Sequence, residues 1–141
     1  PGGRACVCGN QGCLERYISD MAMIERFAEL TGEQISIDQF IAKLKAHDPS
    51  ALALYREFIF YLGLTINNIS QVLNPHAIII NSKIVENMPD CLQEIKTNLM
   101  SKLMSLSILS TSTYRSKTNV LGLTHVLIKE FLDIDNYNVS S

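Results

Sequence analysis

Residues 50–83, SALALYREFIFYLGLTINNISQVLNPHAIIINSK, contain the two patterns that decide the fold. In the first, apolar side chains recur every three or four residues, which predicts one long helix that closes before Asn74-Pro75. Its apolar positions are Leu54, Phe58, Leu62, Ile66, Ile69 and Leu73. The second pattern, Ala77 to Ile80, is a short β-branched run, typical of a fully buried central strand.

Helical periodicity continues on both sides of this stretch. Ahead of it we expect a short helix over 14–19, a second helix capped by Asp20 and ended by Gly32, and a third behind Ser36. After it, residues 85–103 are helical in pattern, and Pro89 restricts the regular helix to the residues that come after the proline. Residues 107–114 read as a second strand, 120–132 as a last helix and 133–141 as a flexible tail. This alternation predicts a helix-rich α/β fold with a small sheet.

Length, hydrophobic content and net charge limit the classes of protein to which the chain can belong. At 141 residues and 47% hydrophobic content, residues 1–141 are expected to form a single domain. A net charge of −2 argues against direct DNA binding by this segment, because such domains usually carry a basic patch. No apolar run is long enough to span a membrane and the N-terminus does not resemble a signal peptide, so we expect a cytoplasmic protein.

Three cysteines lie within the segment CVCGNQGCLE, residues 6–15. Thiolates are strong ligands of soft cations, and glycines let a loop wrap Cys6, Cys8 and Cys13 around one tetrahedral ion, for which zinc is the default. The alternative is three small buried hydrophobic residues, which are seldom clustered. A structural zinc site has four ligands, and we interpret His47, His76 and His125 as ordinary residues and not as the fourth. Cys91 stands apart in a helical pattern.

The segment CVCGNQGCLE matches the CxCGxxGCxE signature of the ROK family, which groups sugar-responsive repressors, sugar kinases and uncharacterised reading frames. The resemblance covers nearly all 141 residues and aligns them with the C-terminal half of a family member. It implies the C-terminal lobe of an actin-like, ribonuclease-H-like ATPase fold, in which Asn-Pro and an apolar strand follow the long helix. The absent initiator Met before Pro1-Gly2-Gly3 agrees with a piece of a longer polypeptide.

The same resemblance implies roles for particular residues. The fourth zinc ligand would be a His upstream of Pro1, so zinc is expected to be weakly held or lost in this chain. Glu15 would accept hydrogen bonds from sugar hydroxyls, although a Glu in the first turn of a helix is also favoured by the helix dipole alone. Family sugar sites also use an Asn-Asp pair and an ExGH segment, and both lie ahead of this chain. The zinc loop would brace the helix that carries Glu15.

One turn separates regulators from kinases in this family. Family kinases carry a Gly-rich turn after the strand, where the backbone approaches adenosine, whereas this chain has Asn81-Ser82-Lys83. The sequence therefore favours a regulator over an enzyme. We interpret the chain as the sugar-sensing domain of a ROK transcriptional repressor of carbohydrate metabolism genes, similar to the xylose-repressor or N-acetylglucosamine-repressor types.

Partners can be inferred from this interpretation. The effector would be a sugar or sugar phosphate, the protein a homo-oligomer such as a dimer, and DNA would be bound only through a helix-turn-helix upstream of this chain. Two alternatives stay open. One is a fragment of a ROK ATP-dependent sugar kinase resembling glucokinase, and the other is a zinc-stabilised interaction module without a small-molecule ligand.

Overall fold

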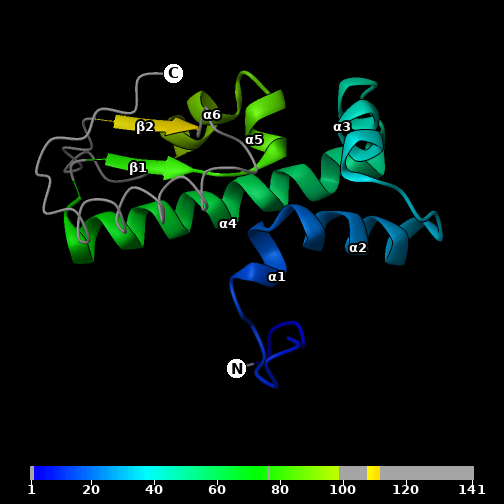
Figure 1. Cartoon of the computed structure of the whole chain (residues 1–141), viewed down its shortest axis with the longest axis horizontal. Coiled ribbons are helices and arrows are strands. Elements are labelled where there is room, and N and C mark those ends of the chain that lie inside the picture. The colour runs from blue at the N-terminus through cyan, green and yellow to red at the C-terminus, as the bar shows by residue number, and fades with distance from the viewer. Residues whose placement is uncertain (1, 76, 99–107, 112–141) are drawn as a thin grey trace, which may run out of the picture. The chain divides into compact units, whose positions relative to one another are not determined.

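The computed structural model describes residues 2–75, 77–98 and 108–111 (Figure 1). The chain divides into two compact units, Pro1–Thr111 and Ser112–Ser141, and the second lies outside the described residues. Several predicted features cannot be compared with the structure because they lie outside the described residues. They are the helix expected over 120–132, the tail 133–141, residues 99–103 of the helix after Pro89, and the histidines His76 and His125.

Helices dominate the described residues, and two short strands form the sheet (Figure 1). In chain order the elements are α1 (Glu15–Ile18), α2 (Asp20–Thr31), α3 (Ile37–Lys45), α4 (Pro49–Leu73), β1 (Ala77–Ile80), α5 (Lys83–Asn87), α6 (Cys91–Asn98) and β2 (Ile108–Thr111). The expected helix-rich architecture with a small sheet is confirmed.

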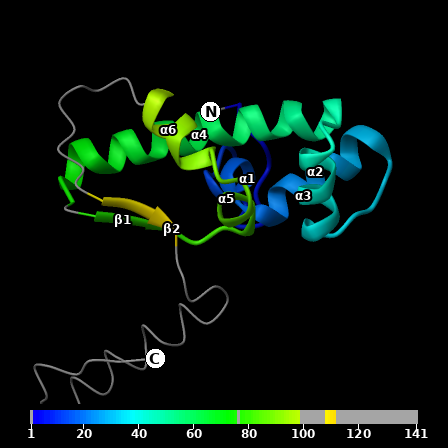
Figure 2. The same ribbon diagram turned by 90° about the horizontal axis from the view of Figure 1, so that it is seen from above.

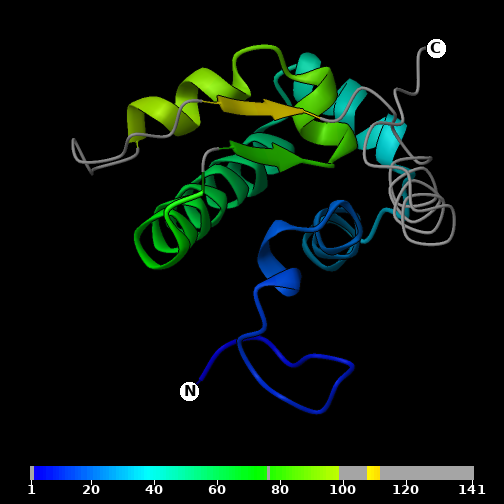
Figure 3. The ribbon, with the colours of Figure 1, turned by 60° about the vertical axis from the view of Figure 1, so that its left-hand side comes forward.

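Helix α4 is the long helix predicted from the apolar repeat. The side chain of Asp48 accepts the N–H of Ala51 at 2.9 Å, and Pro49 occupies the first turn, where its missing N–H costs no hydrogen bond. Asn74 ends the helix in the left-handed conformation, with φ 43°. Because α1, α2, α3 and α6 all contact α4, it is the element around which the others are arranged (Figures 1 and 3).

The observed helix caps match the prediction from the sequence at α3 and differ from it at α2. Ser36 caps α3 in a reciprocal arrangement with Gln39, as a capping box requires. Helix α2 begins at Asp20 itself, and Ser19 caps it by accepting the N–H of Ala22 at 3.1 Å. The prediction that Asp20 is the cap was wrong by one residue, because its carboxylate binds Ser82 instead.

The sheet consists of β1 and β2, which run parallel and pair Ala77 with Ile108 and Ile80 with Thr111 (Figure 2). Side chains alternate along β1, so that Ile78 and Ile80 pack on the core while Ile79 is 66% exposed. The prediction of a fully buried strand was wrong, since only one face of β1 is covered in the described structure and a run of four apolar residues does not reveal this.

Pro89 separates two helices, although only the later one was predicted as regular helix. Helix α5 precedes it and is capped by Ser82, whose hydroxyl accepts the N–H of Val85 at 3.3 Å. Helix α6 comes after it, with Cys91 and Ile95 fully buried. Five residues are too few for apolar periodicity to distinguish α5 from a turn.

The core lies between α2, α3, α4, α5 and α6. Among the described residues, its largest fully buried side chains are Phe27, Phe40, Phe58, Met23, Leu44, Leu54, Ile66, Ile84, Ile95 and Cys91. Phe27 and Phe40 meet edge to face with ring centroids 5.9 Å apart. Among the described helices, none combines the length and the apolar character that a membrane-spanning segment needs.

Candidate metal centre

The cysteine loop, residues 4–13, is a short hairpin closed by backbone hydrogen bonds. The N–H of Gly12 donates to the carbonyl of Arg4 at 2.8 Å, and the N–H of Cys6 donates to the carbonyl of Asn10 at 2.9 Å. Ala5 and Gln11 form an antiparallel bridge between these bonds. The loop therefore holds its shape through its own backbone, and it precedes α1 directly (Figures 1 and 3).

Two glycines allow the base of the loop to close. A Cβ on Gly3 would lie 2.4 Å from the Cα of Gly12, which is closer than a real Cβ approaches another atom, and 3.0 Å from the hydroxyl of Tyr17. Gly12 itself has φ 76°, a conformation that residues with a Cβ rarely adopt. The predicted role of glycine in wrapping the loop is therefore supported at Gly12.

The loop brings the three predicted thiols together. The Sγ atoms of Cys6, Cys8 and Cys13 all lie within 4.8 Å of one another, and those of Cys8 and Cys13 are 3.5 Å apart. Thiolates bound to a tetrahedral zinc at 2.3 Å would be about 3.8 Å apart, so the observed spacing suits such an ion. Within the described residues this is the one group of three or more Cys, His, Asp or Glu side chains able to hold a metal. The alternative of buried hydrophobic cysteines does not fit, since Cys8 is exposed and the other two are half-buried.

The thiols influence one another's ionisation. Hydrogen bonds lower the pKa of Cys8 to about 7, first from the backbone of Asn10 and then from the thiols of Cys6 and Cys13. Hydrogen bonds to the thiol of Cys8 and, to a smaller extent, to that of Cys6 raise the pKa of Cys13 to about 12. Cys8 therefore loses its proton readily, whereas ionisation of Cys13 is disfavoured by its neighbouring thiols. A bound cation would remove this opposition, because its positive charge stabilises all the thiolates at once.

The one histidine among the described residues, His47, does not supply a fourth ligand. His47 comes shortly after α3 with φ 59° and is not part of the thiol group. The expectation that a fourth ligand comes from upstream of Pro1 stays a prediction.

Glu15, the predicted sugar ligand, is the first residue of α1 and is exposed. The N–H of Arg16 donates to the carbonyl of Cys13 at 3.0 Å, so the loop and the first turn of α1 are joined. Among the described residues, no hydrogen bond or ion pair engages the carboxylate of Glu15. The structure thus places an available acidic group two residues after a thiol, and its sugar-binding role stays a prediction.

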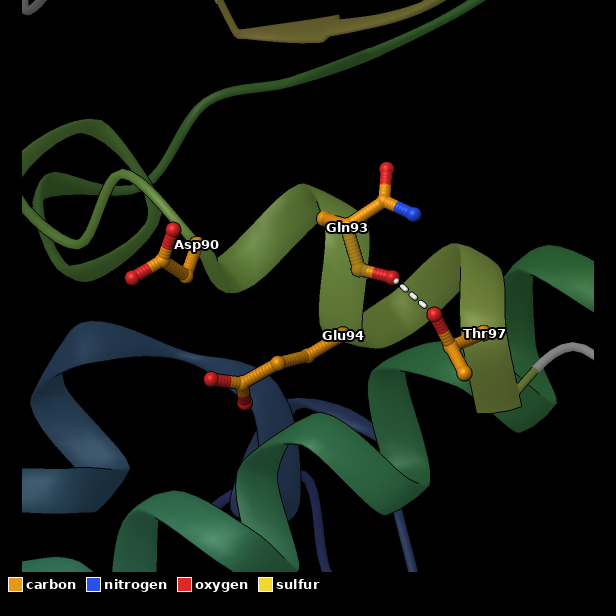
Figure 4. Close-up of a pocket in the computed structure, with 4 residues that line it drawn as sticks. All are labelled: Asp90, Gln93, Glu94 and Thr97. Carbon is orange, nitrogen blue, oxygen red and sulfur yellow. Dashed lines mark hydrogen bonds between the residues drawn. The ribbon is translucent and has the colours of Figure 1, made fainter.

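A second polar feature lies on α6. A surface hollow is lined by Asp90, Gln93, Glu94 and Thr97, and the hydroxyl of Thr97 donates to the carbonyl of Gln93 at 2.9 Å (Figure 4). Neither Glu15 nor any of the three clustered thiols lines it. We assign it no role, because all four residues belong to one helix and the turn before it.

Sequence reasoning missed Arg4, Tyr17 and Glu57, which connect the cysteine loop to α4. The guanidinium of Arg4 lies 4.3 Å from the centre of the Tyr17 ring and pairs with the carboxylate of Glu57. Arg4 and Glu57 are 53 residues apart, so no local pattern could have paired them.

The chain is similar in sequence to the ROK family, including repressors and sugar kinases. The sequence model of the ROK family matches residues 1–130. The xylose repressor of Bacillus spizizenii is 31% identical over 137 residues, which cover 94% of this chain and 35% of that protein. The N-acetyl-D-glucosamine kinase of Pasteurella multocida is 33% identical over 75 residues, covering 53% of this chain and 25% of the kinase. The chain thus spans about a third of the length of the repressor.

Solved structures show the same fold. A ROK family glucokinase from Streptomyces griseus, in complex with glucose and AMPPNP, superposes with a TM-score of 0.72 at 20% identity, covering 88% of this chain and 47% of that one. A ROK family transcriptional regulator, a homologue of the E. coli MLC protein, gives 0.66 at 26% identity, with 79% and 32% covered. The expected actin-like ATPase fold is confirmed.

Proposed function

Because the chain belongs to the ROK family, we propose that it is the sugar-sensing part of a transcriptional repressor that controls carbohydrate metabolism genes. The similarity to a xylose repressor over 94% of the chain supports this proposal. The intact protein would act in the cytoplasm as a dimer, bind a sugar or sugar phosphate, and contact DNA through a helix-turn-helix outside these residues.

One observation carries the proposal: the three clustered thiols directly precede the helix whose first residue is Glu15. Cys6, Cys8 and Cys13 would hold zinc, which supplies a positive charge and a cross-link within the loop. The carbonyl of Cys13 already accepts a hydrogen bond from α1, so a rigid loop would fix the first turn of that helix. The carboxylate of Glu15 would then accept hydrogen bonds from sugar hydroxyls in a set orientation.

Sugar binding would change the protein by favouring one arrangement of its lobes. A ligand shifts an equilibrium only as far as its affinities for the two states differ, so Glu15 would have to contact the sugar better in one state. In a dimer, that state would place the paired DNA-binding heads differently and weaken their affinity for the operator.

The turn after β1 supports a regulator over a kinase. The hydroxyl of Ser82 donates to one carboxylate oxygen of Asp20 at 2.6 Å, and the N–H of Lys83 donates to the other at 2.7 Å. The turn is thus closed by a carboxylate from α2, which occupies the backbone N–H of Lys83. It also lacks the glycine expected where backbone meets adenosine.

The experiment is calorimetric titration of the full-length protein with a panel of sugars, with and without prior removal of metal by a chelator. Glu15→Gln keeps the side-chain volume and removes the charge, and we expect sugar affinity to fall about tenfold or more, because a charged hydrogen bond is lost. Glu29→Gln, a change at an exposed carboxylate of α2, serves as the control and should leave affinity unchanged. Equal sugar affinity in the Glu15→Gln and parent proteins would contradict the role of Glu15, and zinc binding without any sugar response would favour the interaction module.

The second candidate function is a ROK sugar kinase, which the similarity to N-acetyl-D-glucosamine kinase favours. Incubating the full-length protein with ATP and the same sugars tests it directly. We expect no sugar phosphate to form, and measurable phosphorylation of any sugar would replace the repressor with the kinase.

A further inference from the structure

Arg4 is the residue at which the cysteine loop, α1 and α4 meet. Its carbonyl accepts the N–H of Gly12 at the base of the loop at 2.8 Å. Its own N–H donates to the hydroxyl of Tyr17 at 2.9 Å, and its guanidinium donates to the carbonyl of Arg16 at 3.1 Å. This last bond satisfies a carbonyl of α1 that has no partner within so short a helix.

Glu57 of α4 holds Arg4 in this position. One carboxylate oxygen pairs with Arg4, and the other accepts a hydrogen bond from Arg26 of α2 at 2.7 Å. The Arg4, Arg26 and Glu57 side chains are only 24%, 17% and 29% exposed, so water screens these pairs less than it screens a surface pair. Without the carboxylate, two half-buried guanidinium groups would face each other with no counter-charge.

Apolar packing does little to hold the loop. Val7 is 98% exposed, and no residue of the loop belongs to the hydrophobic core. Polar contacts through Arg4 therefore set where the loop lies relative to α1. Since the position of Arg4 determines where Gly12 and the adjoining Cys13 lie, it also affects whether the three thiols can reach one ion.

We propose that Glu57 is a positioning residue for the metal centre, acting through Arg4 although it is not a ligand. The inference rests on the proposed metal-binding role of the loop. It adds that helix α4 contributes to metal affinity from outside the ligand set, so that zinc binding and the packing of α1 on α4 depend on each other.

The experiment measures the zinc affinity of the full-length protein, which includes the residues upstream of Pro1, by competition with a chromogenic chelator. Glu57→Gln should weaken zinc binding about tenfold, in the range typical of residues that orient metal ligands indirectly. Arg4→Met should have a similar effect, and the double variant should be no weaker than either single variant, since both changes break one connection. Glu33→Gln, which removes a carboxylate paired with Lys43 at 3.0 Å, is the matched control and should leave affinity unchanged.

Cobalt(II) gives a second readout, because its absorption bands report how many thiolates bind and in what arrangement. We expect Glu57→Gln and Arg4→Met to alter the cobalt spectrum in the same way. Should Glu57→Gln fail to fold, Arg4→Met decides, because Arg4 lies outside the core. Parent-like zinc affinity and cobalt spectra in both variants would overturn the inference alone. A full-length parent protein that binds no metal would overturn the proposed metal centre as well.

Discussion

The cysteine loop and the helical core are held together by different forces. In the core, large apolar side chains such as Phe58 and Phe27 are at most 1% exposed, and their burial supplies the stabilisation. In the loop, thiols, close-packed glycines and one arginine replace apolar contact. The core can therefore be stable by itself, whereas the loop is held by its own backbone hydrogen bonds and by the polar contacts of Arg4.

This difference suggests why a ligand-binding group would sit beside the loop. A region whose order depends on few polar contacts can change its shape at small cost, while the core keeps the rest of the domain in place. Glu15 stands at the boundary, in the first turn after the loop. Variants in each region can test whether the two are as independent as their contacts indicate.

The largest effect is expected in the core. Phe58→Ala removes a fully buried ring from α4 and should lower the free energy of unfolding by about 3 to 5 kcal/mol, because a cavity remains. Urea denaturation measures this loss. Phe60→Ala, at a 59% exposed position of the same helix, should cost less than about 1 kcal/mol. If Phe58→Ala also weakens zinc binding while the chain is still folded, the two regions are not independent.

Alkaline pH should act on the core through Cys91. Burial raises the pKa of its thiol from 9.0 to about 11, so the unfolded chain loses this proton at lower pH than the folded chain. The resulting stability is complete below the unfolded pKa of 9.0 and is lost as pH rises through about 11, by up to about 2 kcal/mol.

Urea denaturation at several pH values between these limits measures the loss from Cys91. Cys91→Ala should be less stable at neutral pH but should show a shallower decline on the alkaline side. Equal pH slopes in the two proteins would contradict a thiol held neutral by burial.

The smallest effect on stability is expected in the loop. Gly3→Ala places a Cβ against Gly12 and should prevent the loop from closing, so zinc affinity should fall about tenfold. The unfolding free energy of the metal-free chain should change by less than about 0.5 kcal/mol. Gly9→Ala is the control, because a Cβ there meets no atom within 4 Å although φ is 87°. An equal loss of affinity in both variants would mean that backbone conformation, and not the close approach, limits the loop.

Local signals in the sequence predicted most elements and the three thiols. Ser36, Gly32 and Pro89 each act within a few residues of their own position, so their effects on helix ends could be expected. The clustering of the thiols was predictable for the same reason, since Cys6 and Cys13 are joined by a short loop.

Features that depend on distant partners could not be predicted in this way. The sequence could not show that Asp20 would bind Ser82 and leave the cap to Ser19, nor that Glu57 would hold Arg4. The exposure of Ile79 depends on which strand face is covered, and an unbroken apolar run contains no information on that point.

The hydrogen bond between Ser82 and Asp20 has a consequence for the order of folding. It joins residues 62 positions apart, and such a non-local contact requires a loop closure that the local contacts of helices do not. Helices α2, α3 and α4 can form and associate before it, whereas the start of α2 becomes anchored only after β1 and the turn beyond it are in place. The turn beyond β1 would thus acquire its final orientation late, once most of the described helices are in place.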